Sequence, residues 1–159
     1  MALIAMVYSS KGEPEVFHNS RLLLNSTIGA VNTLFLLVSG FFMAQSVRFF
    51  KQQAISKASV CLKLTVLGGL LFLALKGFEY YDKIEMGYSI GYNNFFSFYW
   101  MLTLFHVIHV LVGIVILLIM YLDIRKKGAE ASLENIEASA AFWHMCDIIW
   151  ILLFPVIYL

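Results

Sequence analysis

Charge is scarce in this chain of 159 residues, where Asp, Glu, Lys and Arg together make up 13% of the sequence. A soluble globular domain contains about 25% of such residues, so this composition excludes an ordinary water-soluble fold. The 11 basic residues nearly balance the 10 acidic ones, which leaves no positive surplus for nucleic acid and no acidic surplus for disorder. We therefore expect an integral membrane protein with no nucleic-acid partner.

Cysteine and the common catalytic motifs are equally scarce. Cys61 and Cys146 each lie alone in an apolar stretch, so neither a disulfide framework nor a CxxC site is indicated. The sequence has no glycine-rich phosphate loop, no nucleophile elbow and no exposed acid–base pair. We therefore expect buried thiols and no catalytic residue in this chain itself.

Long apolar runs, by contrast, are abundant, and a membrane span needs about 20 mostly apolar residues to cross about 30 Å of hydrocarbon. Four runs meet this requirement, at residues 22–47, 58–81, 95–122 and 138–159. The sequence therefore predicts an all-α membrane protein, a bundle of about four transmembrane helices within residues 22–159. Residues 1–21 would form an N-terminal tail or interfacial stub. Its first eight residues are too short to span and lack a basic segment, so we expect no signal peptide.

Positive charge is unevenly divided between the predicted loops. The first and third loops carry six Lys and Arg residues, whereas the N-terminal tail and the second loop carry three. By the positive-inside rule, the first and third loops are then cytoplasmic. We therefore predict that both termini are periplasmic and that the chain lies in the inner (plasma) membrane as a multi-pass protein.

Several polar and aromatic residues of the predicted spans suggest internal contacts. Lys76 and Glu79 are three residues apart on one helical face, where an ion pair would lower the cost of placing both near lipid. Aromatic residues cluster at span ends, which is typical of an interfacial belt. This group includes Tyr80, Tyr81, Tyr99, Trp100, Trp143 and Tyr158. Small residues such as Gly40 and Gly69 predict faces for close helix packing, and these faces are candidates for contact with a partner.

Three histidines and an aspartate inside the last two spans allow three interpretations. His106 and His109 are three apart on one helix, and His144 and Asp147 are three apart on the next. One hypothesis is a single haem between a third-span histidine and His144. A second gathers all four residues into a metal site or proton relay. The third is internal hydrogen bonding, with Asp147 paired to His144 or to a neighbouring helix, which holds the helices together in lipid.

Read in order, four blocks of the sequence resemble subunit III of the haem–copper oxidases. The first combines Leu24-Asn25 with residues 32–40 (NTLFLLVSG), and the second is Glu79-Tyr80-Tyr81 at the end of a span. The third is the histidine-rich segment 106–113 (HVIHVLVG), and the last is residues 140–150 (AAFWHMCDIIW). The resemblance implies a fold like the C-terminal helices of cytochrome c oxidase subunit III. The ending of the chain is most similar to the short NorE-like branch associated with nitric oxide reductases.

The resemblance implies an accessory, cofactor-free subunit of a terminal oxidase or nitric oxide reductase in a respiratory electron transport chain. Haem and copper, or non-haem iron, would lie in a subunit I-like catalytic partner. This chain would stabilise that partner, bind lipid and support proton uptake. The residues that match family positions would be structural or lipid-contacting, namely Glu79, His106, His109, His144 and Asp147.

The sequence differs from the family at its front, and this leaves a second hypothesis open. Full-length members have seven spans and short members about five, whereas four are predicted here. The family's lipid-holding cleft, which needs the earlier helices, is therefore not predicted from these residues. The alternative is an independent metal-binding or proton-coupled transport protein that uses His106, His109, His144 and Asp147.

Overall fold

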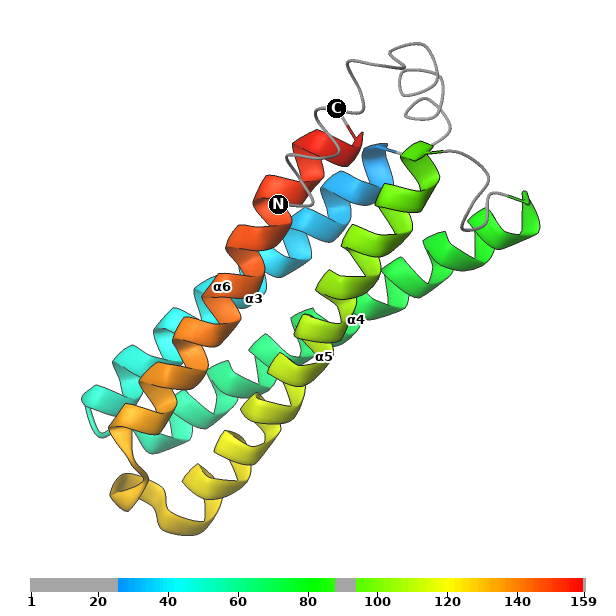
Figure 1. Ribbon diagram of the computed structural model, residues 1–159. Helices are drawn as coiled ribbons and strands as arrows, with labels where there is room; N and C mark the ends of the chain where they lie inside the picture. Colours follow the sequence, from blue (N-terminus) through cyan, green and yellow to red (C-terminus); the bar gives the residue numbers. More distant parts are fainter. Residues whose placement is uncertain (1–25, 88–93, 159) are drawn as a thin grey trace.

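Four long helices and one short 3-10 helix make up the described part of the chain (Figure 1). The structure is a computed structural model that describes residues 26–87 and 94–158. The elements are α3 (Ser26–Lys51), α4 (Ile55–Glu85), α5 (Asn94–Lys127), η1 (Gly128–Glu130) and α6 (Leu133–Tyr158). Within these residues there is no β-strand, and the predicted all-α fold is confirmed.

All four long helices are long and apolar enough to cross a membrane, as predicted. Some extend beyond the predicted apolar runs. Helix α5 continues from Leu122 to Lys127, and α6 begins at Leu133 rather than at Ala138. The helices continue beyond the hydrocarbon because the backbone keeps its hydrogen bonds there, and the added turns are largely polar because they lie in the headgroup region. The predicted tail at residues 1–21 lies outside the described residues.

The helices run alternately up and down, and each packs against two others (Figure 1). Helices α3 and α5 each contact both α4 and α6. The connection between α3 and α4 is a tight turn, in which Gln53 has a φ of 61° and the Ala54 amide donates to the Phe49 carbonyl. So short a connection makes α3 and α4 antiparallel neighbours.

The interior of the bundle is rich in aromatic residues, whereas its outer faces are largely aliphatic. The largest fully buried side chains include Trp143, Trp150, Tyr99 and Phe72. Outward-facing residues from all four long helices are about half exposed or more, among them Leu34, Leu67, Ile119 and Leu152. Lipid tails are as apolar as these side chains, so such a surface is suited to a bilayer.

The glycines of α3 and α4 lie mainly against the chain's own side chains. A Cβ at Gly69 would lie 2.6 Å from Cη2 of Trp143, and a Cβ at Gly40 would overlap the Asp147 carboxylate. Gly40 therefore marks a close contact between α3 and α6, as predicted, and Gly69 makes room for the ring of Trp143. The prediction of a partner face is wrong at Gly69, because Trp143 of α6 fills the space beside it, whereas Gly40 lines a groove on the outer surface and its contact with a partner stays a prediction.

Candidate functional site

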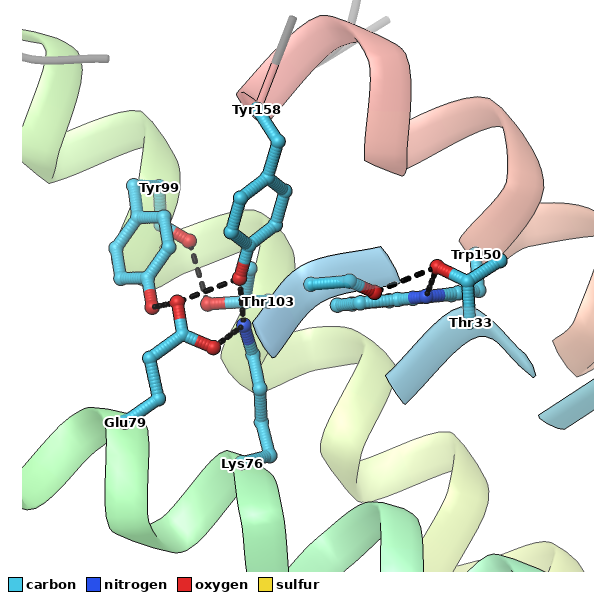
Figure 2. Close-up of polar contacts among 8 residues, drawn as sticks. Thr33, Lys76, Glu79, Tyr99, Thr103, Trp150 and Tyr158 are labelled. Atoms are coloured by element: carbon cyan, nitrogen blue, oxygen red, sulfur yellow. Dashed lines mark hydrogen bonds and ion pairs between the residues drawn. The ribbon is translucent and has the colours of Figure 1, made fainter. Parts of the chain in front are cut away.

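A buried ion pair lies at the end of the bundle where α4 and α6 end and α5 begins (Figure 2). Lys76 Nζ is 2.9 Å from Glu79 Oε2, and the two side chains are 1% and 3% exposed. The i, i+3 spacing on α4 brings the two groups to one face of the helix, so the predicted pair is confirmed. Its surroundings differ from the expectation, because both residues face the bundle and neither faces lipid.

Two tyrosines from other helices complete the hydrogen bonding of this ion pair (Figure 2). The hydroxyl of Tyr99, on α5, donates to Glu79 Oε1 at 2.9 Å, and the hydroxyl of Tyr158, on α6, donates to the same oxygen. Lys76 Nζ donates to the Tyr158 hydroxyl at 2.7 Å. We refer to Lys76, Glu79, Tyr99 and Tyr158 as the buried cluster, which joins α4 to both α5 and α6.

Aromatic rings surround the Lys76 ammonium. Nζ lies 5.0 Å from the ring centroid of Trp150, 5.2 Å from those of Tyr99 and Tyr158, and 5.6 Å from that of Tyr80. Desolvated cation–π contacts of this kind offset part of the cost of removing an ammonium from water. Within the cluster, both carboxylate oxygens of Glu79 accept hydrogen bonds, so the arrangement favours a rigid connection between helices over chemistry on a substrate.

Two indole hydrogen bonds connect α6 to α3. Trp150 Nε1 donates to Thr33 Oγ1 at 3.0 Å, which is visible in Figure 2. Trp143 Nε1 donates to Ser39 Oγ at 3.1 Å, and that hydroxyl in turn donates to the Thr65 carbonyl of α4 at 2.8 Å. These two indoles and the hydroxyls of Thr33 and Ser39 are thus paired across helices, as expected where lipid provides no hydrophobic driving force.

His106 and His109 lie in different environments although they are one turn apart on α5. His106 is 1% exposed, with its ring centroid 5.0 Å from that of Trp150 and 5.5 Å from that of Phe72. Among the described residues, neither of its ring nitrogens has a hydrogen-bond partner. His109 is half-buried at the edge of the helix, and its Nδ1 lies 2.8 Å from the Phe105 carbonyl oxygen.

His144 and Asp147 lie together at the seam between α6 and α3. His144 Nδ1 is 3.4 Å from Asp147 Oδ2, which is at the outer limit for a hydrogen bond. This proximity supports the predicted pairing of the two residues. Asp147 is 6% exposed, and its other oxygen, Oδ1, has no hydrogen-bond partner among the described residues.

The four residues considered for a metal site or proton relay are therefore not brought together. His106 lies against Phe72 and Trp150 in the interior, whereas Asp147 and His144 lie against Gly40 of α3. In residues 26–87 and 94–158, no group of three or more His, Cys, Asp or Glu residues is placed to hold a metal ion. The structure thus separates the hypothesised four-residue set into two places.

Three aromatic residues, two of them in the buried cluster, lie elsewhere than the sequence predicts. Tyr99, Trp143 and Tyr158 were expected in an interfacial belt, but they are 0%, 0% and 5% exposed. The belt interpretation is wrong for these three, and it fits Tyr81, which is 61% exposed. The signal available in the sequence was the ion pair itself, because a buried carboxylate needs more hydrogen-bond donors than a single lysine offers.

Comparison with known proteins gives a consistent family assignment. The sequence profile of the family described as "Cytochrome c oxidase subunit III" matches residues 22–159. The chain is 31% identical over 146 residues to the cytochrome bo(3) ubiquinol oxidase subunit 3 of Buchnera aphidicola, which covers 91% of this chain and 68% of that protein. All four membrane helices thus lie within the matched region.

Two further relatives are named cytochrome c oxidase subunit 3. The protein of Synechocystis is 30% identical over 138 residues, which is 86% of this chain and 58% of the relative. That of Rhipicephalus sanguineus is 34% identical over 137 residues, which is 86% of this chain and 49% of the relative. The chain thus spans between about half and two thirds of the length of the relatives described.

Proposed function

Because the chain belongs to the cytochrome c oxidase subunit III family, we propose that it is an accessory subunit of a haem–copper oxidase in a respiratory electron transport chain. The observation that carries the proposal is the match over residues 22–159, which includes every described membrane helix. Relatives named as subunits of a ubiquinol oxidase and of cytochrome c oxidases support a terminal oxidase as the complex. A place in the branch associated with nitric oxide reductases stays a prediction.

In this proposal the redox centres belong to a catalytic, subunit I-like partner. The described residues of this chain do not gather a metal-ligand set. The hydrogen bonds of the Lys76–Glu79 ion pair are completed by two tyrosine hydroxyls of the same chain. Haem and copper would supply oxygen chemistry in the partner. This chain would stabilise that subunit, bind membrane lipid and support proton uptake.

The candidate site residues divide into two proposed roles. Glu79 and His106 are interior and hold α4, α5 and α6 at fixed separation, Glu79 through the buried cluster and His106 through aromatic packing. His109 and His144 are only partly buried, and with Asp147 they are candidates for contact with lipid or with the partner. Residues 22–159 would then act as one subunit III-like domain.

Purification from native membranes in mild detergent tests the proposal. We expect a tagged form of the chain to recover a haem-bearing membrane protein in constant ratio, as measured by the haem absorbance of the complex. The separated chain should show neither haem absorbance nor stoichiometric metal.

Recovery of the chain only as a monomer or homo-oligomer would contradict the proposal. A stoichiometric metal that is lost in His109→Ala would favour the alternative, an independent metal-binding or proton-coupled membrane protein. An unrelated tagged membrane protein from the same cells controls for haem proteins that adhere to the resin.

A further inference from the structure

The outer flank of α5 carries a partly exposed histidine, His109, at mid-membrane depth. At 1.5 Å per residue, His109 is about 21 Å along the helix from Phe95 and about 20 Å from Leu122, the two ends of the apolar run. A hydrocarbon layer is about 30 Å thick, so lipid headgroups and bulk water do not reach this depth. Histidines inside membranes are rare and face protein or a water-filled cavity, so a lipid-facing imidazole here needs a partner.

A hydrogen bond within α5 fixes which nitrogen of His109 carries the proton. Nδ1 lies 2.8 Å from the carbonyl oxygen of Phe105, and a carbonyl oxygen only accepts, so the hydrogen is on Nδ1. A charged imidazolium is disfavoured in hydrocarbon, so the ring is neutral and Nε2 is solely an acceptor. The Phe105 ring, with its centroid 4.4 Å from that of His109, packs against the imidazole. The side chain thus presents one acceptor in a fixed orientation.

The acceptor atom of His109 is both unpaired and accessible. No donor to Nε2 lies among the described residues. The two nitrogens of His106 and Oδ1 of Asp147 are enclosed by the chain's own atoms, but Nε2 of His109 is not. A donor outside the bundle can therefore reach Nε2, and the cost of an unsatisfied polar atom in hydrocarbon favours such a contact.

The chemistry of Nε2 restricts which molecule covers this flank. A lipid tail fits the neighbouring apolar side chains but has no donor. A second copy of the chain, related by a two-fold axis, would bring one acceptor nitrogen toward another. A membrane-spanning helix of a different subunit offers both an apolar surface and a side-chain donor at the required depth.

We infer that a membrane-spanning helix of the catalytic subunit packs on the flank of α5 around His109 and donates a hydrogen bond to His109 Nε2. The donor is a hydroxyl, amide or indole side chain at mid-membrane depth. The inference rests on the proposed function, which supplies the partner, and adds the place and the chemistry of the contact.

Photo-crosslinking in native membranes locates the contact. A photoreactive amino acid replaces Val112 or Leu111, which are 46% and 48% exposed and lie at nearly the same depth. At 100° per residue, Val112 is about 60° from His109 around the axis of α5, whereas Leu111 is about 160° away. We expect the catalytic subunit, identified by mass spectrometry, to be captured from Val112 and not from Leu111. Equal capture from both positions would overturn the inference, as would capture from Val112 of only a second copy, the same chain or lipid.

Two variants of His109 test the hydrogen bond in the intact complex. His109→Phe keeps a ring but removes the acceptor, and should lower the haem recovered per chain in mild detergent about threefold, the size expected for one interhelical hydrogen bond. His109→Gln keeps an acceptor oxygen at a similar reach and should retain more haem than His109→Phe. Both variants should keep the wild-type melting temperature, because the side chain lies at the edge of the bundle.

The outcomes separate the inference from the proposed function. Wild-type recovery from His109→Phe, or recovery from His109→Gln no better than from His109→Phe, would overturn the hydrogen bond while the proposed function stands. Absence of a haem-bearing companion from the wild-type chain would overturn the proposed function itself.

Discussion

The ion pair of Lys76 and Glu79 shows what a charge requires when it is placed between membrane helices. Its i, i+3 spacing is a local property of α4, so the pair could be predicted from the sequence. Its tyrosine partners could not, because Tyr99 and Tyr158 reach Glu79 only through the rotation of α5 and α6 about their own axes. A tyrosine ring with a hydroxyl is suited both to a membrane interface and to a buried donor position, and composition does not separate the two.

Removal of one member of the ion pair should be strongly destabilising. In Lys76→Met, the Glu79 carboxylate loses its cation while it stays buried at 3% exposure. Breaking a buried pair in this way costs about 3–5 kcal/mol in the free energy of unfolding. We expect a large fall in the melting temperature, measured by circular dichroism in detergent.

The double variant Lys76→Met, Glu79→Gln is the control for this prediction. Glutamine keeps an oxygen that accepts from Tyr99 and Tyr158, while neither charge remains. The double variant should therefore be more stable than Lys76→Met alone. A double variant that is less stable than the single one would show that the charge on Glu79 is not the source of the loss.

His106 gives a prediction of the opposite kind. Its ring packs on Trp150 and Phe72, and neither nitrogen has a hydrogen-bond partner among the described residues. Phenylalanine preserves the aromatic packing and removes two unsatisfied polar atoms, so His106→Phe should leave the melting temperature unchanged or raise it. A loss of more than about 2 kcal/mol would instead indicate a hydrogen bond to a buried water or to a partner subunit.

At the scale of the elements, the lengths of the helices are easier to predict than the faces they bury. Hydropathy alone placed all four helices, because lipid requires each span to satisfy its own backbone hydrogen bonds. Burial depends on small angles. Residues three apart on a helix differ by about 60° in direction, which is enough to place His106 inside the bundle and His109 at its edge.

The packing of Trp143 on Gly69 can be tested against a matched glycine on the same helix. In Gly69→Leu the new side chain meets Trp143, since even a Cβ would lie 2.6 Å from its Cη2 atom. Overpacking of this kind costs about 1–3 kcal/mol or more. Gly77 has nothing within 4 Å of a Cβ, so Gly77→Leu should cost little. Equal melting temperatures for the two variants would show that the Trp143 ring does not pack against Gly69.

At the scale of the whole molecule, the two ends of the bundle differ in charge. Helix α3 ends, α4 begins and α5 ends at one end, which is the lower left in Figure 1. This end carries the basic residues Arg48, Lys51, Lys57, Arg125, Lys126 and Lys127. The buried cluster lies near the opposite end, where Lys76 and Lys83 are 1% and 5% exposed. The lysines of that end within the described residues are thus buried, and this increases the difference in exposed positive charge between the two ends of the bundle.

This asymmetry predicts that both termini face the periplasm. Basic loops are retained in the cytoplasm by the positive-inside rule, so the basic end should be cytoplasmic and the end that holds the buried cluster periplasmic. A reporter active only in the periplasm, fused after Leu159, should therefore be active, and the same reporter fused after Lys127 should be silent. A second reporter that is active only in the cytoplasm should give the reverse pattern at the same two sites. Cytoplasmic activity after Leu159 would contradict the predicted orientation.

Neutralising Arg125, Lys126 and Lys127 together should weaken the preference for this orientation and give mixed reporter activity at both fusion sites, because half of the basic residues at that end are then lost.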